Sequence, residues 1–526
     1  MIKPVLFINA HFPEIYQLRG DAILVKNGLI DFIGAREDSL QRAKCLDFEL
    51  IDLAGKTLMP GLCDFHLHLA YTAEKIAAVD CETDSLEECL QGVAERAKTT
   101  PAGEWIIGYN WNHNIWQPPE YGTAEQLDAI SSQHPILLHA KSLHAAWVNS
   151  SAMRIAGISK DSPDPDGGVI LRNALGEPNG ILLENAIALV TSKLPEVTVE
   201  QHAQNILKTQ AYFHSLGLTA VHDFDGFPSA EALLLLADRG ELKLRVTKNL
   251  PLTDLDRVIA EDWRKKLDKP PFLTPGWLKA FADGALGPQS AAMLEPYEAS
   301  QNLGMLLIDA EDLAAKGMLA DQHNWPLSVH AIGDRAVREV IDAFAIIRKQ
   351  QSPLRAKQSP LRIEHVQLIQ PSDLQRMRDL DLVASVQPIH APSDMEVADR
   401  LWGKRTKFAY AYQSLFEHGI ESRFGSDSPV ESPNPFIGLH AAVTRQNLDG
   451  YPSPEGWHPE QRVSLENAVS AYTQSLPNNG ETNPIRPGKP ADFIVLEEDL
   501  FNLPPSQLAT VKPLKTIVGG EIVFER

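Results

Sequence analysis

Eight short apolar runs, separated by stretches of helical pattern, occupy the middle of this 526-residue chain and most constrain its fold. The predicted strands are residues 62–69, 218–223, 242–250, 277–283, 327–332, 361–368, 382–389 and 421–427. The predicted helices between them include residues 201–216, 334–348 and 410–418. This alternation predicts an α/β fold, a (β/α)8 TIM-type barrel with a parallel sheet. An open doubly wound sheet gives the same alternation and stays an alternative.

One interval breaks this rhythm. Roughly 150 residues separate the first predicted strand from the second, far beyond a normal crossover. We therefore expect residues from about 75 to 200 to form an insertion, a lid or subdomain over the site.

Both ends of the chain have the pattern of short strands joined by turns. Residues 22–26 and 29–34 flank an Asn-Gly pair, the strongest short hairpin signal. Near the other end, residues 491–496, 515–518 and 522–524 are strand-like. Neither end has enough strands to bury a sheet alone. We expect them to form one discontinuous β-sandwich domain, residues 1–58 with 482–526, around a barrel at residues 59–481.

Composition narrows the function classes. Apolar residues make up 44% of the chain and charged residues 22%, which is typical of a globular protein. The net charge of −21 disfavours binding to nucleic acid or to an anionic membrane. Because the sequence shows neither a signal-peptide pattern nor an apolar run of about 20 residues, a cytoplasmic protein is expected. The sequence leaves the oligomeric state open, and a homodimer is one of the possibilities.

Two histidines close the first predicted strand. Residues 64–68 read Asp-Phe-His-Leu-His, and side chains alternate across a strand, so His66 and His68 can converge on one metal ion. Further residues follow near the ends of later strands: Lys279, His330, His365 and Asp427. In a barrel these strand ends meet at one face. Each residue alone fits an ordinary structural role, but their recurrence in order after the His-x-His pair indicates a metal site.

Residues 52–68 resemble the entry to the barrel of the amidohydrolase superfamily. The resemblance covers nearly the whole chain and implies that the metal ligands are His66, His68, Lys279, His330, His365 and Asp427. Four further segments resemble the amidohydrolase-3 branch, which includes N-substituted formamide deformylase-like proteins: residues 144–150, 279–287, 330–336 and 425–430.

The resemblance implies a hydrolase that cleaves the C–N bond of an amide, N-formyl or N-acyl group. It also implies that the site holds one or two divalent metal ions. Zinc is expected first, and Mn, Fe or Co also suit imidazole and carboxylate ligands. Lys279 is expected to be carboxylated, which would supply an anionic oxygen between two ions, whereas an ordinary lysine paired with Asp283 or Asp223 would leave one ion. Asp427 is the expected general base and then general acid.

Four more residues are candidates for contact with substrate: Tyr109, Trp111, His144 and Arg445. Packing or surface charge explains each of them equally well. Alternative functions stay open at this point: an aminoacylase-, deaminase- or cyclic-amidase-type member of the same superfamily, or a metal-binding scaffold without turnover.

Overall fold

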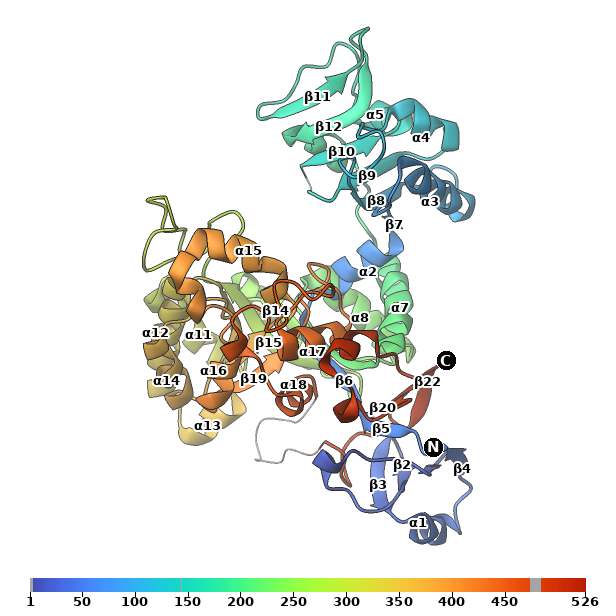
Figure 1. Cartoon of the computed structure of the whole chain (residues 1–526), viewed down its shortest axis with the longest axis vertical. Coiled ribbons are helices and arrows are strands. Elements are labelled where there is room, and N and C mark those ends of the chain that lie inside the picture. The colour runs from blue at the N-terminus through green and yellow to red at the C-terminus, as the bar shows by residue number, and fades with distance from the viewer. Residues whose placement is uncertain (1–2, 143, 474–483) are drawn as a thin grey trace. The chain divides into compact units, whose positions relative to one another are not determined.

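The computed structural model describes residues 3–142, 144–473 and 484–526 of the chain, and Figure 1 labels its helices and strands. The chain divides into two compact units. The first unit comprises Met1–Ala70 and Ile206–Arg526, and the inserted unit comprises Tyr71–Asn205. Each unit is described by itself.

The first unit contains an eight-stranded sheet whose strands follow one another in chain order. All neighbouring pairs along it are parallel. The strands are β6 (Leu62–Leu67), β13 (Leu218–Asp223), β14 (Arg245–Pro251), β15 (Leu273–Phe281), β16 (Leu327–Ala331), β17 (Arg362–His365), β18 (Val383–Val386) and β19 (Glu421–Phe424). All eight predicted strands are therefore present.

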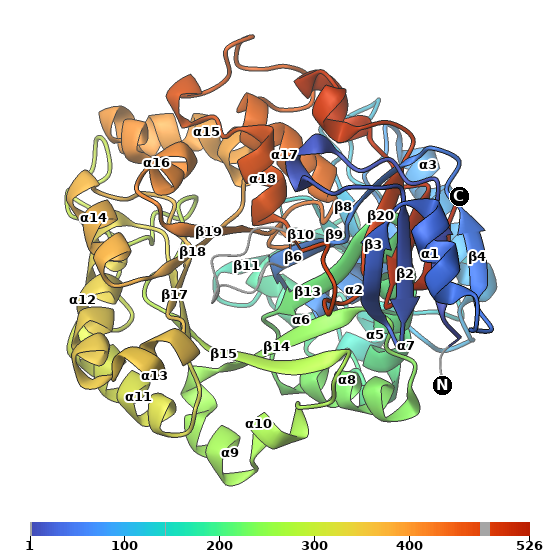
Figure 2. The ribbon, with the colours of Figure 1, turned by 90° about the horizontal axis from the view of Figure 1, so that it is seen from below.

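The two outer strands of this sheet, β6 and β19, meet at their carboxyl ends. The backbone N–H of Asp427 donates to the carbonyl of His66 at 2.7 Å, and that of His68 donates to the carbonyl of Ser428 at 2.7 Å. Figure 2 shows the strands around a ring. A doubly wound sheet reverses its strand order and keeps two free edges. The fold is therefore a TIM-type barrel.

Helices follow the barrel strands and lie outside the ring (Figure 2). They are α7 (Val199–Ser215), α8 (Phe227–Arg239), α9 (Leu255–Ala260), α10 (Trp263–Lys266), α11 (Ala310–Gln322), α12 (Asp334–Gln350), α13 (Pro353–Gln358), α14 (Pro371–Asp379), α15 (His390–Trp402), α16 (Tyr412–Glu417), α17 (Pro435–Thr444) and α18 (Leu465–Ala471). In α12 the buried residues Val337, Val340, Ile341 and Phe344 recur at helical spacing. Burial of each such side chain contributes about 1.5–3 kcal/mol.

Three predicted strands extend three residues too far at their carboxyl ends. β17 ends at His365, β18 at Val386 and β19 at Phe424. The backbone enters the left-handed region at His365 (φ 73°) and at Asp427 (φ 58°). Such a conformation costs a non-glycine residue about 1–3 kcal/mol and persists only where surrounding contacts impose it. It turns both side chains away from the directions that a continuing strand would give them.

Two four-stranded sheets from the two ends of the chain form a β-sandwich. One has the order β3-β2-β1-β4 and the other β22-β21-β20-β5. Their bounds are β1 (Val5–Ile8), β2 (Ala22–Lys26), β3 (Leu29–Gly34), β4 (Glu49–Asp52), β5 (Thr57–Pro60), β20 (Phe493–Leu496), β21 (Lys515–Val518) and β22 (Glu521–Glu525). Both sheets contribute to one core, where the rings of Phe7 and Phe493 lie 6.2 Å apart. The predicted boundary at residue 482 lies outside the described residues, and the exact domain limits stay a prediction.

The inserted unit has its own sheet of six strands, in the order β11-β12-β10-β9-β8-β7. The strands are β7 (Val79–Asp80), β8 (Ile106–Trp111), β9 (Ile136–Ala140), β10 (Ala145–Val148), β11 (Gly168–Arg172) and β12 (Pro178–Glu184). Three helices of this unit are α3 (Leu86–Thr99), α4 (Ala124–Ile130) and α5 (Ser150–Ala156). Its buried apolar residues form two clusters of their own, as expected of a separately packed unit.

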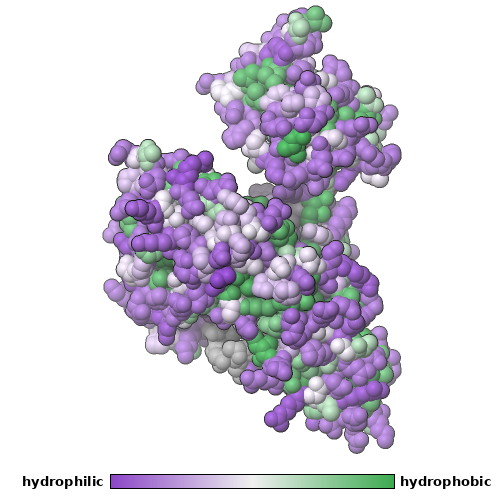
Figure 3. All heavy atoms as spheres, viewed as in Figure 1, coloured by the Kyte–Doolittle hydropathy of each residue, from purple (hydrophilic) through white to green (hydrophobic). Residues whose placement is uncertain are grey.

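The face drawn in Figure 3 is mainly hydrophilic, with small hydrophobic patches between polar side chains. Within the described ranges, no helix combines the length and the apolar character needed to cross a bilayer.

Candidate metal centre

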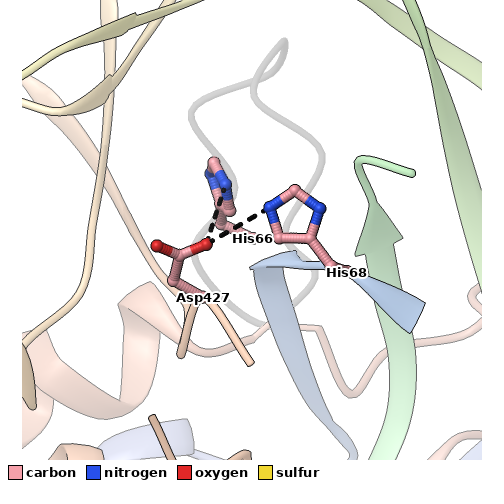
Figure 4. A group of neighbouring side chains, drawn as sticks. All are labelled: His66, His68 and Asp427. Atoms are coloured by element: carbon pink, nitrogen blue, oxygen red, sulfur yellow. Dashed lines mark ion pairs between the residues drawn. The ribbon is translucent and has the colours of Figure 1, made fainter. Parts of the chain in front are cut away.

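The two histidines of the first barrel strand face the carboxylate that follows the last strand. His66 lies on β6, and His68 follows it directly. Their Nε2 atoms lie 3.4 and 3.5 Å from Oδ1 of Asp427 (Figure 4). Suitable ligand atoms of all three residues lie within 4.8 Å of one another, which is close enough for one cation to bind all three after small side-chain adjustments.

The other ring nitrogen of each histidine contacts a carboxylate. Nδ1 of His66 lies 2.5 Å from Oε2 of Glu364, and Nδ1 of His68 lies 3.0 Å from Oδ1 of Asp225. An ionised carboxylate only accepts, so Nδ1–H donates in both cases, and when the ring is neutral the lone pair is on Nε2. This is the outer-shell arrangement that orients metal-ligating histidines.

Nε2 of His66 is buried and lacks a hydrogen-bond partner within the described part of the chain. An unpaired buried acceptor costs about 1–3 kcal/mol, so such atoms are uncommon without a ligand. A cation between this nitrogen and Asp427 satisfies both groups. The donor set of imidazole nitrogens and one carboxylate therefore fits a divalent metal ion.

A second pair of histidines lies beside the first. The ring of His365 is 4.8 Å from that of His66 and 4.5 Å from that of His330, between ring centres. Nδ1 of His365 donates to Oε1 of Gln387 at 2.9 Å, and Nε2 of His330 donates to the carbonyl of Gly284 at 2.9 Å. Neutral oxygens thus accept the hydrogen bonds of this second pair, and the Asp283 carboxylate lies farther from Nε2 of His330, at 3.6 Å.

Burial controls the charge of these imidazoles. Burial and, next, the charge of Lys279 lower the pKa of His66 to about 4 and that of His330 to about 3. Burial and the neighbouring histidines hold the pKa of His365 well below its ordinary range. Burial also lowers the pKa of His68, but its hydrogen bonds to Asp225 and Asp427 outweigh burial and raise the value to about 9. At neutral pH, three of the four rings are therefore neutral, as metal ligation requires.

Asp427 is held as a carboxylate. Burial alone would raise its pKa, but His68 and the nearby imidazoles hold the pKa well below the ordinary range. Asp64 fixes the turn that carries Asp427: its carboxylate accepts from the backbone N–H of His66 at 3.0 Å and of Ser426 at 3.1 Å. This buried carboxylate therefore ties β6 to the end of β19.

Lys279 is buried on β15, and its Nζ lies 4.7 Å from the ring centre of Phe224 and 5.0 Å from that of Phe281. Burial lowers its pKa to about 8, although nearby carboxylates partly oppose the shift. Asp223 and Asp283, the two carboxylates expected to pair with an ordinary Lys279, have other partners. Asp223 pairs with Lys248 at 2.7 Å, and Asp283 accepts from three backbone N–H groups.

The predicted substrate residues have packing partners. Trp111 is 1% exposed in the core of the inserted unit and donates from Nε1 to the carbonyl of Leu138. Arg445, at the end of α17, is 0% exposed and donates to the carbonyls of Trp457 and Tyr410. These contacts give both residues structural roles, and contact of either with a substrate stays a prediction.

The other two substrate residues belong to the inserted unit. The ring of Tyr109 stacks on that of His139, with 5.0 Å between their centres. His144 is exposed and contacts Glu184 at 2.9 Å. Their roles toward a substrate stay predictions.

Sequence reasoning missed three residues near the centre: Glu364, Asp225 and His390. Glu364 and Arg362 alternate on β17 as buried charged residues, and two charged residues in so short a predicted strand are a signal that the sequence displays. His390 is the first residue of α15 and lies just beyond the carboxyl end of β18. The other predicted ligands were found by the same kind of position, after the end of a strand. Asp225 follows β13 in the same way.

The fold and this centre define a class: a barrel-type, metal-dependent hydrolase. The amidohydrolase family profile matches residues 49–524, and the chain belongs to the amidohydrolase family.

Similar proteins span nearly the whole chain. YtcJ of Bacillus subtilis (strain 168) is 32% identical, covering 97% of this chain and 96% of its own. The N-substituted formamide deformylase of Arthrobacter pascens is 27% identical, covering 100% of this chain and 99% of its own. A crystal structure of an uncharacterized metal-dependent hydrolase from Pyrococcus furiosus has a TM-score of 0.76 at 25% identity, covering 95% of this chain and 100% of that one.

Proposed function

We propose that this hydrolase cleaves the C–N bond of an amide, N-formyl or N-acyl group in a small molecule. One observation carries the proposal: the buried Nε2 of His66, which has no hydrogen-bond partner among the residues that the structure describes, faces the carboxylate of Asp427 at 3.4 Å. The name of the Arthrobacter pascens relative, N-substituted formamide deformylase, supports a C–N bond as the target.

His66, His68 and Asp427 would hold the first divalent ion, with zinc the first candidate and Mn, Fe or Co the others. When bound, such an ion acidifies water and polarises a carbonyl group at neutral pH.

Asp427 then performs the proton transfers. Its carboxylate accepts a proton as the water oxygen adds to the carbonyl carbon, and it is available as a base because its pKa is held low. Asp427 next delivers that proton to the nitrogen as the C–N bond breaks, so an acid and an amine leave. The same residue thus serves as base and acid in one turnover.

We further propose that Lys279 is carboxylated, and its carbamate would supply an anionic oxygen ligand if two ions bind. The Lys279 nitrogen would attack carbon dioxide and lose a proton, giving an anion where a buried ammonium would repel cations. The pKa of about 8 supports this step, since a substantial fraction of the amine is neutral near pH 7 to 8.

The test is turnover by full-length protein stripped of metal and reloaded with zinc. The substrates are matched N-formyl, N-acetyl and longer N-acyl amines, N-acyl amino acids, a cyclic amide, an ester and an aminopurine. Hydrolysis of an acyclic amide only by the reloaded protein supports the proposal. Activity confined to the ester, the cyclic amide or the aminopurine would replace it with another chemistry, and full metal binding without any turnover would favour a scaffold.

A further inference from the structure

His390 is a buried imidazole at the centre that the proposed reaction has not used. It is the first residue of α15 and is 6% exposed. Its ring stacks on that of His365, with centres 6.4 Å apart and planes 6° from parallel. Ligand atoms of His390, His365 and Asp427 lie within 4.8 Å of one another.

The contact of the ring with Gln367 indicates where its proton lies. The amide Nε2 of Gln367 lies 3.4 Å from Nδ1 of His390, and an amide N–H can only donate. Nδ1 therefore accepts, which places the ring proton on Nε2. This Nε2 is buried and lacks a hydrogen-bond partner within residues 3–142, 144–473 and 484–526. A buried N–H donor of this kind indicates a ligand that completes it.

We propose that Nε2–H of His390 donates a hydrogen bond to the carbonyl oxygen of the substrate and to the negative charge that develops there. The inference rests on the proposed function. The attacking water must give its proton to Asp427, so it needs an acceptor rather than another donor. The carbonyl oxygen, in contrast, gains charge as water adds, and a fixed N–H donor stabilises it most at that stage.

One alternative role uses the same atoms. If the Gln367 amide presented its oxygen, Nδ1 would carry the proton and Nε2 of His390 would be a metal ligand with His365 and Asp427. The two roles differ in metal binding: a ligand holds the ion without substrate, whereas a donor to substrate leaves the metal content unchanged.

Two substitutions of His390 separate the two ring nitrogens. His390→Asn keeps a polar group near the position of Nδ1, within reach of Gln367, and removes the outer donor. His390→Gln places an amide N–H near the position of Nε2 and is the matched rescue. His390→Phe keeps the stacked ring without either nitrogen, and serves if the Asn variant does not fold.

The readout is calorimetric binding of methylphosphonate, a tetrahedral anion, to zinc-loaded full-length protein. We expect His390→Asn to keep the wild-type zinc content and to bind the phosphonate about 10- to 100-fold more weakly, the range of one hydrogen bond to a charged group. His390→Gln should recover part of the affinity.

Equal affinity in wild type and His390→Asn overturns the proposal, and so does loss of zinc, which would make His390 a ligand. An absence of phosphonate binding to the wild type overturns it as well. These measurements need no substrate, so failure of the amide panel would count against the proposed function without altering the result for His390.

Discussion

The two halves of the centre hold their histidines differently. In the β6 half, His66 and His68 each donate from Nδ1 to a carboxylate, Glu364 or Asp225. In the β16–β17 half, His330 and His365 donate to a carbonyl and an amide oxygen. All four imidazoles lie at the carboxyl ends of barrel strands, so the difference is in what lies behind them.

A carboxylate behind an imidazole makes the ring more basic and fixes it more firmly than a neutral oxygen does. The β6 half is therefore expected to bind the first ion tightly, and the β16–β17 half to bind a second ion more weakly. Whether the enzyme has one ion or two then depends mainly on the second half and on Lys279, whose buried amine could supply a bridging anion.

The largest effect on turnover is expected at Asp427. Its carboxylate lies within ligand distance of histidines from both halves of the centre. Asp427→Asn keeps an oxygen near the ion but removes the proton acceptor. Turnover should fall by about 10²- to 10⁴-fold, the usual contribution of a general acid–base group, while the fold and the first ion remain. The measurement is kcat on the amide found in the panel, with circular dichroism and metal analysis of the same sample.

The matched control is Asp449→Asn, the same change at an exposed loop residue of the first unit, which should leave kcat unchanged. Wild-type turnover in Asp427→Asn would remove this residue from the reaction.

The next largest effect is expected at Lys279. Lys279→Met removes the anion that a second ion needs, so zinc should fall from two ions per chain to one, held by the β6 half. Elemental analysis measures the ratio, and incubation with ¹³C-bicarbonate should give a carbamate NMR signal in the wild type that the variant lacks. An unchanged ratio, or no carbamate signal in the wild type, contradicts the bridging role.

A smaller effect tests the comparison directly by exchanging the groups behind the histidines. Asp225→Asn leaves His68 with a neutral acceptor, and Gln387→Glu gives His365 a charged one. We expect the first variant to weaken the tighter zinc site by about 10- to 100-fold and the second to tighten the weaker site. Competition with a fluorescent chelator measures both constants. Equal affinities across wild type and variants would mean that the outer groups do not set the difference.

Much of the fold could be predicted from local pattern. Strand and helix periods are local properties of the chain, so the eight barrel strands and the hairpin at residues 22–34 are confirmed by the structure. The ends of strands depend on tertiary contacts instead. His365 and Asp427 adopt positive φ values that no local preference of histidine or aspartate requires.

The same limit applies to the centre. The six predicted ligands all lie near the carboxyl end of a strand, and this position can be recognised in the sequence. The carboxylates behind the histidines cannot be recognised in this way, because Glu364 is 298 residues from His66 and Asp225 is 157 residues from His68. Such pairs form only when the barrel closes, so the contrast between the two halves could not be predicted from the sequence.

The smallest expected effect is a pair of opposite pH trends in the stability of metal-free protein. The pKa of His68 is raised from 6.5 to about 9, so its contribution is full below about pH 6.5 and is lost as pH rises through 9. The pKa of His330 is lowered from 6.5 to about 3, so its contribution is present above pH 6.5 and is lost as pH falls toward 3. Asp64 and Asp283 have pKa values raised to about 7 and also titrate in this range, so each histidine variant must be compared with the wild type at the same pH.

The measurement is the urea midpoint of unfolding at pH 5, 7 and 9. The loss of stability caused by His68→Gln should shrink as pH rises, and the loss caused by His330→Gln should shrink as pH falls. Parallel trends would mean that Asp225 and Asp427 do not set the charge of His68, and the contrast between the two halves would then lose its electrostatic basis.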